Sequence, residues 1–147
     1  FTGQLLVLPD DAGTWLAGLS RAGEPLPLPD PDAVALVQFT GGTTGRPKGV
    51  MLTHRALAAN VAQREAVLPT LWADERVVCV MPLFHSFASA MAHLLAPNCA
   101  GTLVLLPRYR PDLLQQTIAA EGITRLPAGP TLVQSLLQWD GFDAQAF

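Results

Sequence analysis

Short apolar runs alternate with segments of helical periodicity along most of the chain. Runs rich in Val, Leu and Ile predict strands at residues 34–39, 50–52, 77–81, 102–106 and 123–126. The segments between them predict helices that begin after Thr53, at Phe84, at Asp112 and at Pro130, and that end at Pro69, Leu95, near Gly122 and at Trp139. Strands that alternate with helices predict an α/β fold, with a largely parallel sheet covered by helices on both faces.

Local signals define the ends of two of these helices. Thr53 is a predicted N-cap, because its hydroxyl can accept a hydrogen bond from a free backbone N–H, and Pro69 ends the same helix. Asp112 followed three residues later by Gln115 resembles a capping box. Gly122 is placed to end that helix. We therefore expect one helix before and one helix after the apolar runs at residues 77–81 and 102–106 in the sequence.

The N-terminal part of the chain has a different character. Prolines alternate with other residues between Glu24 and Asp32, and such a pattern favours extended backbone that lacks ladder donors. We predict that residues 1–33 form a Pro-rich connecting segment and that residues 34–147 form the organised domain. Because apolar and polar residues still alternate when the chain stops, we expect it to be a piece of a larger protein.

A long uncharged stretch raises the alternative of a membrane span. No Asp, Glu, Lys or Arg occurs between Arg76 and Arg108, and about 20 apolar residues suffice to cross a bilayer. Pro82 and Pro97 interrupt this stretch, and serines and histidines add polar groups to it. A buried strand, a helix and a second strand explain it better, so no transmembrane segment is predicted.

Composition narrows the classes of partner. Half of the 147 residues are apolar and only 14% are charged, against a usual charged share of about 25%. The net charge of −3 argues against nucleic acid, which needs a basic surface. Cys79 and Cys99 have no metal-type spacing, and the chain shows no signal-peptide pattern, so a reducing, cytoplasmic setting is expected. So few charges also predict apolar surface that promotes self-association into homo-oligomers.

The segment with the clearest chemistry is residues 39–50, FTGGTTGRPKGV. Glycines let backbone N–H groups approach an anion closely, and threonine hydroxyls add donors. Lys48, the only lysine of the chain, supplies a mobile cation suited to terminal phosphates. The segment has neither Walker A nor dinucleotide-fold spacing. We interpret it as a loop that binds a triphosphate; an ordinary surface turn is the alternative.

These residues resemble a known signature. The segment from Thr40 to His54 is similar to the phosphate-binding motif of the adenylate-forming (AMP-binding) superfamily, which includes acyl-CoA synthetases, luciferases and the adenylation domains of peptide synthetases. Residues 81–88, MPLFHSFA, resemble the family's Pro-Leu-Phe-His motif, and residues 129–132 resemble its Val-Pro-Thr segment. The resemblance identifies residues 34–147 as a partial AMP-binding domain, a fragment of the large N-terminal domain of such an enzyme.

The resemblance implies a site and its ligands. The residues expected to bind the ATP phosphates are Thr40, Gly41, Gly42, Thr43, Thr44, Gly45 and Lys48. His85 is the expected catalytic residue, placed where the carboxylate meets the α-phosphate; packing is the alternative for a lone histidine in an apolar run. ATP, Mg²⁺ and coenzyme A are implied as ligands. No metal-binding residue is predicted, because the family's acidic metal ligand lies beyond the end of this chain.

The resemblance also implies a reaction. A carboxylate attacks ATP to give an acyl-adenylate, and coenzyme A then takes the acyl group, as in an acid-thiol ligase. Gly41 stands where most of the superfamily has serine, a version more like the medium- and long-chain fatty acyl-CoA synthetases, and Ala88 stands where glycine is common. A fatty acid is therefore the expected substrate, and this fragment alone is expected to be inactive. The alternatives are a domain that loads a carrier protein, a non-catalytic nucleotide- or acyl-binding module, and a peripheral membrane protein.

Overall fold

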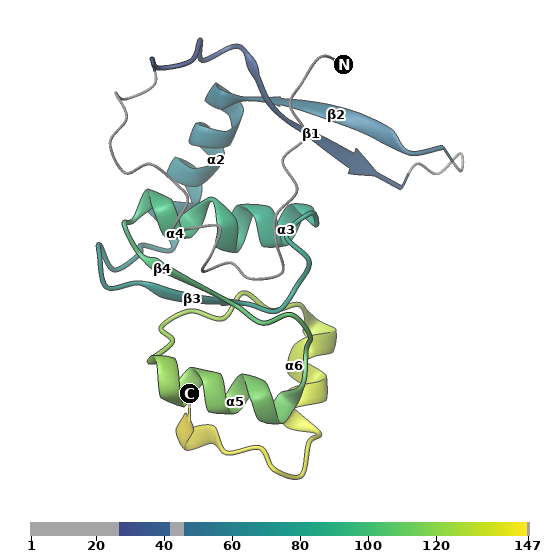
Figure 1. Cartoon of the computed structure of the whole chain (residues 1–147), viewed down its shortest axis with the longest axis vertical. Helices are drawn as coiled ribbons and strands as arrows, with labels where there is room; N and C mark the ends of the chain where they lie inside the picture. Colours follow the sequence, from purple (N-terminus) through teal and green to yellow (C-terminus); the bar gives the residue numbers. More distant parts are fainter. Residues whose placement is uncertain (1–26, 42–45, 147) are drawn as a thin grey trace, which may run out of the picture.

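The computed structural model describes residues 27–41 and 46–146. In the described part, two pairs of strands and a set of short helices follow one another along the chain (Figure 1). The strands are β1 (Val34–Thr40), β2 (Lys48–Thr53), β3 (Arg76–Cys79) and β4 (Thr102–Leu105). The helices are α2 (His54–Val67), α3 (Ser86–Ala88), the π-helix η1 (Ser89–His93), α4 (Leu95–Asn98), α5 (Pro111–Glu121), α6 (Pro130–Leu137) and the short η2 (Ala144–Ala146).

The centre of the molecule is a parallel pair of strands. β3 and β4 pair in register from Arg76–Thr102 to Cys79–Leu105, and Val77 also forms a parallel bridge with Arg125. Figure 1 shows α3 and α4 on one side of this pair and α5 and α6 on the other. The predicted α/β fold, with helices on both faces of parallel strands, is therefore confirmed.

Strand alternation divides the core into two layers. Successive side chains of a strand point to opposite faces, so Val77 and Cys79 pack with one set of helices and Val78 with the other. The first layer contains Ala88, Ala92, Leu95, Ala96 and Cys99 from the 86–99 helical segment. The second layer contains Leu114, Ile118 and Leu136 from α5 and α6. The uncharged stretch thus supplies a buried strand, a helical segment and a second strand, as predicted. Within the described ranges, no helix is long and apolar enough to cross a membrane.

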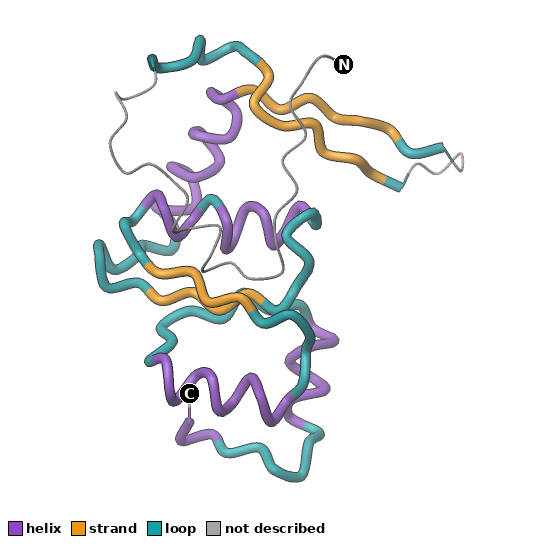
Figure 2. The backbone as a smooth tube through the Cα atoms, viewed as in Figure 1, coloured by secondary structure: helices purple, strands orange, loops and turns teal. Residues whose placement is uncertain are grey.

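The other two strands form a separate antiparallel hairpin. β1 pairs with β2 from Val34–Thr53 to Thr40–Lys48, and Figure 2 shows this hairpin extending away from the parallel pair. Each of its residues is exposed or half-buried. The apolar run at residues 34–39 correctly predicts a strand. It does not show that the strand pairs outside the parallel sheet.

Several helix ends agree with the sequence, and one cap does not. The Thr53 hydroxyl accepts a hydrogen bond from the Ala56 amide, at 3.2 Å, and so caps α2 as predicted. Gly122 ends α5 in the left-handed conformation, with φ of 57°. The predicted capping box is wrong: Pro111 starts the helix one residue earlier, and the N-cap, Arg110, makes no side-chain cap bond. Proline is favoured at this first position because its missing N–H needs no partner there.

Two further elements differ from prediction. The helix predicted at residues 84–95 begins only at Ser86, because His85 has extended backbone and caps it. Its middle is the π-helix η1, and Arg64 of α2 donates to the Ala90 carbonyl within it. The strand predicted at residues 123–126 is reduced to the single bridge at Arg125.

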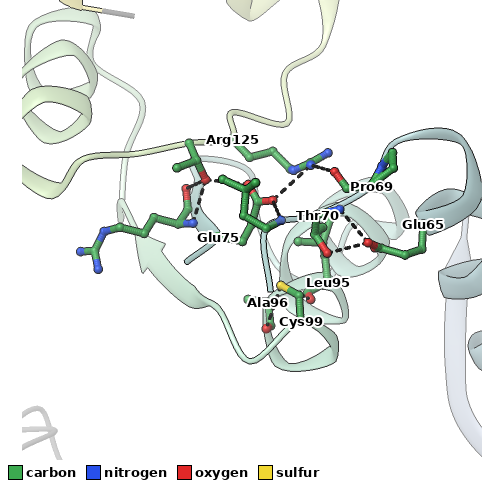
Figure 3. A network of polar contacts seen from close by, with 11 residues as sticks. Glu65, Pro69, Thr70, Glu75, Leu95, Ala96, Cys99 and Arg125 are labelled. Atoms are coloured by element: carbon green, nitrogen blue, oxygen red, sulfur yellow. Dashed lines mark hydrogen bonds and ion pairs between the residues drawn. The ribbon is translucent and has the colours of Figure 1, made fainter. Parts of the chain in front are cut away.

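A buried polar network around Glu75 ties the loop before β3 to the segment that follows α5 (Figure 3). Glu75 is 1% exposed. It accepts hydrogen bonds from the Thr124 hydroxyl at 2.6 Å, the Leu71 amide at 2.9 Å and the Arg125 guanidinium at 3.2 Å. Burial alone would raise the pKa of this carboxyl, but the three hydrogen bonds outweigh burial and hold its pKa below the ordinary value.

Gly101 provides a test of how tightly this region is packed. A Cβ at Gly101 would lie 2.5 Å from the Glu75 carbonyl oxygen and 3.0 Å from the Cys99 sulfur. We expect Gly101→Ala to destabilise the parallel pair by about 1–3 kcal/mol, because backbone must shift to admit the methyl group. The measurement is hydrogen exchange at the Thr102 amide, which donates to the Glu75 carbonyl. Gly129→Ala is the control, since a Cβ there meets nothing within 4 Å; equal protection in both variants would contradict the expectation.

Candidate functional site

The hairpin presents the two ends of the predicted phosphate loop side by side. Thr40 is the last residue of β1 and Lys48 the first of β2, and they are register partners. Thr40, Gly41 and Lys48 are exposed. The expected donors Gly42, Thr43, Thr44 and Gly45 lie outside the described residues. The structure therefore places the two residues that flank this segment opposite each other in the hairpin.

Lys48 is available to an anion. No carboxylate of the described residues lies within ion-pair distance of its ammonium group, whereas Arg55, Arg76, Arg110 and Arg125 each pair with an acidic side chain. A flexible lysine that is not engaged by a carboxylate can follow a phosphate with its point charge. This is the electrostatic property that the proposed loop requires.

His85 is fixed by its place at the start of α3. Its backbone N–H donates to the Pro82 carbonyl at 2.9 Å, and its own carbonyl accepts from the Ser89 amide at 2.9 Å. Its ring Nδ1 accepts from the Phe87 amide at 3.2 Å. A neutral imidazole with an accepting Nδ1 carries its proton on Nε2. The exposed ring therefore offers Nε2–H as its donor.

The structure brings the two sequence motifs together. A pocket of about 300 Å³ lies between the end of β1 and the start of α3; its lining residues are Gln38, Phe39, Thr40, Gly41, Phe84, His85 and Ser86. The Gln38 side-chain amide donates to the Phe84 carbonyl at 2.7 Å across this junction, 46 positions away in sequence. Thr40, Gly41 and His85, predicted separately from two motifs, thus line one pocket.

Sequence analysis named only Thr40, Gly41 and His85 among these lining residues, and it missed the polar side chains of Gln38 and Ser86. A signal existed for Gln38, since it is the polar residue within the apolar run 34–39. The period-2 alternation of a strand also places it on the same face as Thr40. For Ser86 the only signal was its position next to His85.

The third motif does not line this pocket. Residues 129–132 start α6, whose Leu132 packs against the second core layer. The stretch Arg108–Tyr109–Arg110, which carries two arginines just before α5, does not line the pocket either, and Arg110 pairs with Asp112. Tyr109 and Leu132 pack beside the second core layer, and the Tyr109 hydroxyl donates to the Leu132 carbonyl at 3.3 Å.

The described residues do not form a metal site of their own. They contain no group of three or more His, Cys, Asp or Glu side chains placed to hold a metal ion. Among the described residues that line the pocket there are hydroxyl, amide and imidazole groups but no carboxylate, whereas Mg²⁺ prefers carboxylate and phosphate oxygens. The donor set therefore suits an anionic ligand rather than a bare cation.

Comparison with known proteins agrees with this geometry. A family model described as AMP-binding enzyme matches residues 5–146. The chain belongs to the AMP-binding enzyme family. This confirms the adenylate-forming superfamily suggested by the three motifs. The match begins within the segment predicted to be a connector, whose residues 1–26 are not described.

Relatives in the AMP-binding enzyme family include several CoA ligases. The chain is 37% identical over 139 residues to sulfoacetate–CoA ligase of Cupriavidus necator, covering 90% of the chain and 26% of the relative. It is 34% identical over 109 residues to 4-coumarate–CoA ligase 1 of Arabidopsis thaliana, covering 72% of the chain and 19% of that protein. The chain thus spans about a quarter or less of the length of these relatives.

Solved structures of other proteins share its fold. ATP-bound MatB from Rhodopseudomonas palustris superposes with a TM-score of 0.76 at 28% identity, over 88% of this chain and 25% of that one. O-succinylbenzoate coenzyme A synthetase (MenE) from Bacillus subtilis, in complex with ATP and magnesium ion, superposes with a TM-score of 0.69 at 27% identity. The match covers 85% of this chain and 26% of the synthetase chain. The matched region thus makes up about a quarter of each of these solved chains.

Proposed function

We propose that this chain supplies the ATP phosphate-binding part of an acid-thiol ligase. The enzyme would activate a carboxylic acid as an acyl-adenylate and pass the acyl group to coenzyme A. The observation that carries the proposal is the pocket that Thr40 and Gly41, at the head of the Gly/Thr loop, line together with His85. The family match and the CoA ligases among the relatives support it.

The residues divide into two roles. Thr40, the loop amides and hydroxyls, and Lys48 neutralise the charge that develops on the departing pyrophosphate, since catalysis of such transfers consists mostly of positioning and charge stabilisation. His85 donates Nε2–H to an oxygen where the carboxylate meets the α-phosphate. Mg²⁺, when bound to ATP, adds charge neutralisation at the phosphates. Its protein ligand is not proposed among the described residues.

The proposed acid substrate is a medium- or long-chain fatty acid. Support comes from the loop sequence, in which Gly41 takes the place of a serine, as in the fatty acyl-CoA synthetases that the motif resembles. The relatives named above are ligases of sulfoacetate and 4-coumarate, so short anionic and aromatic acids belong in the same test. Loss of a serine hydroxyl leaves the phosphate contacts to threonines, backbone N–H groups and Lys48.

The test is acid-dependent ATP–pyrophosphate exchange by the natural full-length protein. The panel comprises fatty acids, 4-coumarate, sulfoacetate and amino acids, followed by a second assay for acyl-CoA when coenzyme A is added. We expect a fatty acid to stimulate exchange at least about 10-fold above the acid-free rate, a difference of about 1.4 kcal/mol in barrier height.

Each other outcome points elsewhere. Stimulation by an aromatic or short acid alone keeps the ligase and replaces the substrate. Exchange without acyl-CoA formation favours a domain that loads a carrier protein. A folded full-length protein that binds ATP without exchange on any acid contradicts the ligase and favours a non-catalytic nucleotide-binding module.

We also propose a cytoplasmic location and self-association. Cys79 and Cys99 are buried free thiols, which suits a reducing compartment. Phe39, Met51 and Trp72 are 68%, 70% and 73% exposed, and apolar side chains of this size favour association. A sizing column that returns a monomer at all concentrations would contradict self-association.

A further inference from the structure

We propose that Gln38 is a positioning residue, which holds the backbone of His85 against the strand that leads into the phosphate loop. The proposal rests on the function proposed above, because Gln38 is assigned its effect through His85. It adds to that function a residue that lies outside all three sequence motifs.

The strand determines where the Gln38 side chain points. Gln38 pairs with Val50 in the middle of the hairpin, and it is half-buried, whereas its neighbours Val37 and Phe39 are exposed. Alternation places Gln38 and Thr40 on the same face of β1, and both line the pocket with His85. Gln38 therefore faces the segment around His85 from a position two residues before the end of β1.

The contact is made to the peptide unit that precedes His85. The Gln38 Nε2 donates to the Phe84 carbonyl oxygen at 2.7 Å. The other edge of the same peptide unit, the His85 N–H, donates to the Pro82 carbonyl at 2.9 Å. Both edges of this peptide plane are thus held, one by the loop itself and one by the hairpin. The bond from Gln38 is the one that joins the hairpin to this segment, and it determines how far His85 lies from Thr40.

A purely stabilising role explains this bond poorly. Phe84 is 81% exposed and the hydrogen bond lies at an exposed position, so water would satisfy the carbonyl if the amide were removed. The net contribution of such a hydrogen bond to the free energy of unfolding is therefore small. What water cannot supply is a fixed distance between the two motifs, and a misplacement of about 1 Å can cost about 100-fold in rate.

The experiment replaces Gln38 by leucine in the natural full-length protein. We expect kcat for acid-dependent ATP–pyrophosphate exchange to fall by about 10- to 100-fold, while KM for ATP changes less than about 2-fold, because the phosphate loop itself is intact. In a His85→Ala background the same substitution should lower kcat by less than about 2-fold, since the effects of residues that act as a unit are not additive. Gln63→Leu, an exposed glutamine of α2, is the matched control. Gln38→Met serves as a second variant.

The outcomes separate this proposal from the one on which it rests. If the wild-type protein shows no acid-dependent exchange, both proposals are overturned. If the wild type exchanges but Gln38→Leu equals it, or if the losses from Gln38→Leu and His85→Ala multiply, only the role of Gln38 is overturned. Loss of ATP binding and a lowered melting temperature in both Gln38 variants would assign it a structural role and would also overturn the proposal.

Discussion

Replacement of Lys48 by alanine is expected to reduce ATP–pyrophosphate exchange by about 100- to 1,000-fold, the loss typical when one preorganised group that stabilises the transition state is removed. Lys48 is exposed at the start of β2, opposite Thr40, and no carboxylate of the described residues pairs with it. Its charge is therefore available to the phosphates, and no other lysine can replace it.

The control for Lys48→Ala is Arg110→Ala. This variant removes the same charge from an exposed position, where the arginine pairs with Asp112 at the start of α5. Exchange should stay within about 2-fold of the wild type, because exposed charges far from a site are screened by salt. Equal losses in the two variants would mean that net charge matters and that Lys48 has no local role. An unchanged rate in Lys48→Ala would contradict its role at the phosphates.

Replacement of Glu75 by glutamine is expected to destabilise the parallel pair by about 3–5 kcal/mol, because removal of one member of a buried ion pair leaves the other charge uncompensated. Glu75 is 1% exposed and the Arg125 side chain 16%. The measurement is native-state hydrogen exchange of the Val78 amide, which donates to the Arg125 carbonyl at 3.0 Å. We expect protection there to fall in proportion to the lost free energy.

The chain offers a matched control in a second Glu–Arg pair. Glu121 pairs with Arg76 at 2.8 Å, with the two side chains 49% and 35% exposed. Glu121→Gln should cost less than about 1 kcal/mol, as exposed ion pairs usually do. Similar losses in the two variants would contradict the view that burial makes the Glu75 pair important.

The same carboxyl gives the fold a pH dependence of definite sign. The pKa of Glu75 is lower in the folded protein than its ordinary value. Its contribution to stability is therefore fully present above the ordinary carboxyl pKa, and it is lost as the pH falls through the lower, folded-state pKa. Protection of the Val78 amide should decline over that acid range in the wild type, and less so in Glu75→Gln.

Local signals predicted much of the fold. The hydroxyl of Thr53, the left-handed Gly122 and the first-turn Pro130 act within a few residues, and each was found where the sequence placed it. The capping box failed because Asp112 has a competing partner in Arg110 and because Pro111 begins the helix. The sequence pattern alone does not tell which of these local interactions determines the helix start.

Partners distant in sequence could not be predicted in this way. Glu75 is a charged residue next to a strand, which usually means solvent exposure, and it becomes buried because Arg125, 50 positions away, satisfies it. Likewise, two motifs predicted Thr40 and His85, but only the folded chain shows that they line one pocket. Gln38 lies within an apolar run that predicts only a strand. Its hydrogen bond to the Phe84 carbonyl, 46 positions away, exists only in the folded chain.

The two strand pairs also imply an order of events during folding. The β1–β2 hairpin joins residues close in sequence, so its loop closes cheaply, but a two-stranded hairpin alone is marginally stable. The parallel β3–β4 pair joins residues such as Arg76 and Thr102 through an intervening helical segment, and such non-local pairing forms slowly. Because Ala88, three residues after His85, belongs to the same core layer as Val77 of β3, we expect His85 to reach its position only after that slow pairing. We therefore expect the two halves of the site to meet late in folding, when the hairpin docks onto a helix that the parallel strands already hold.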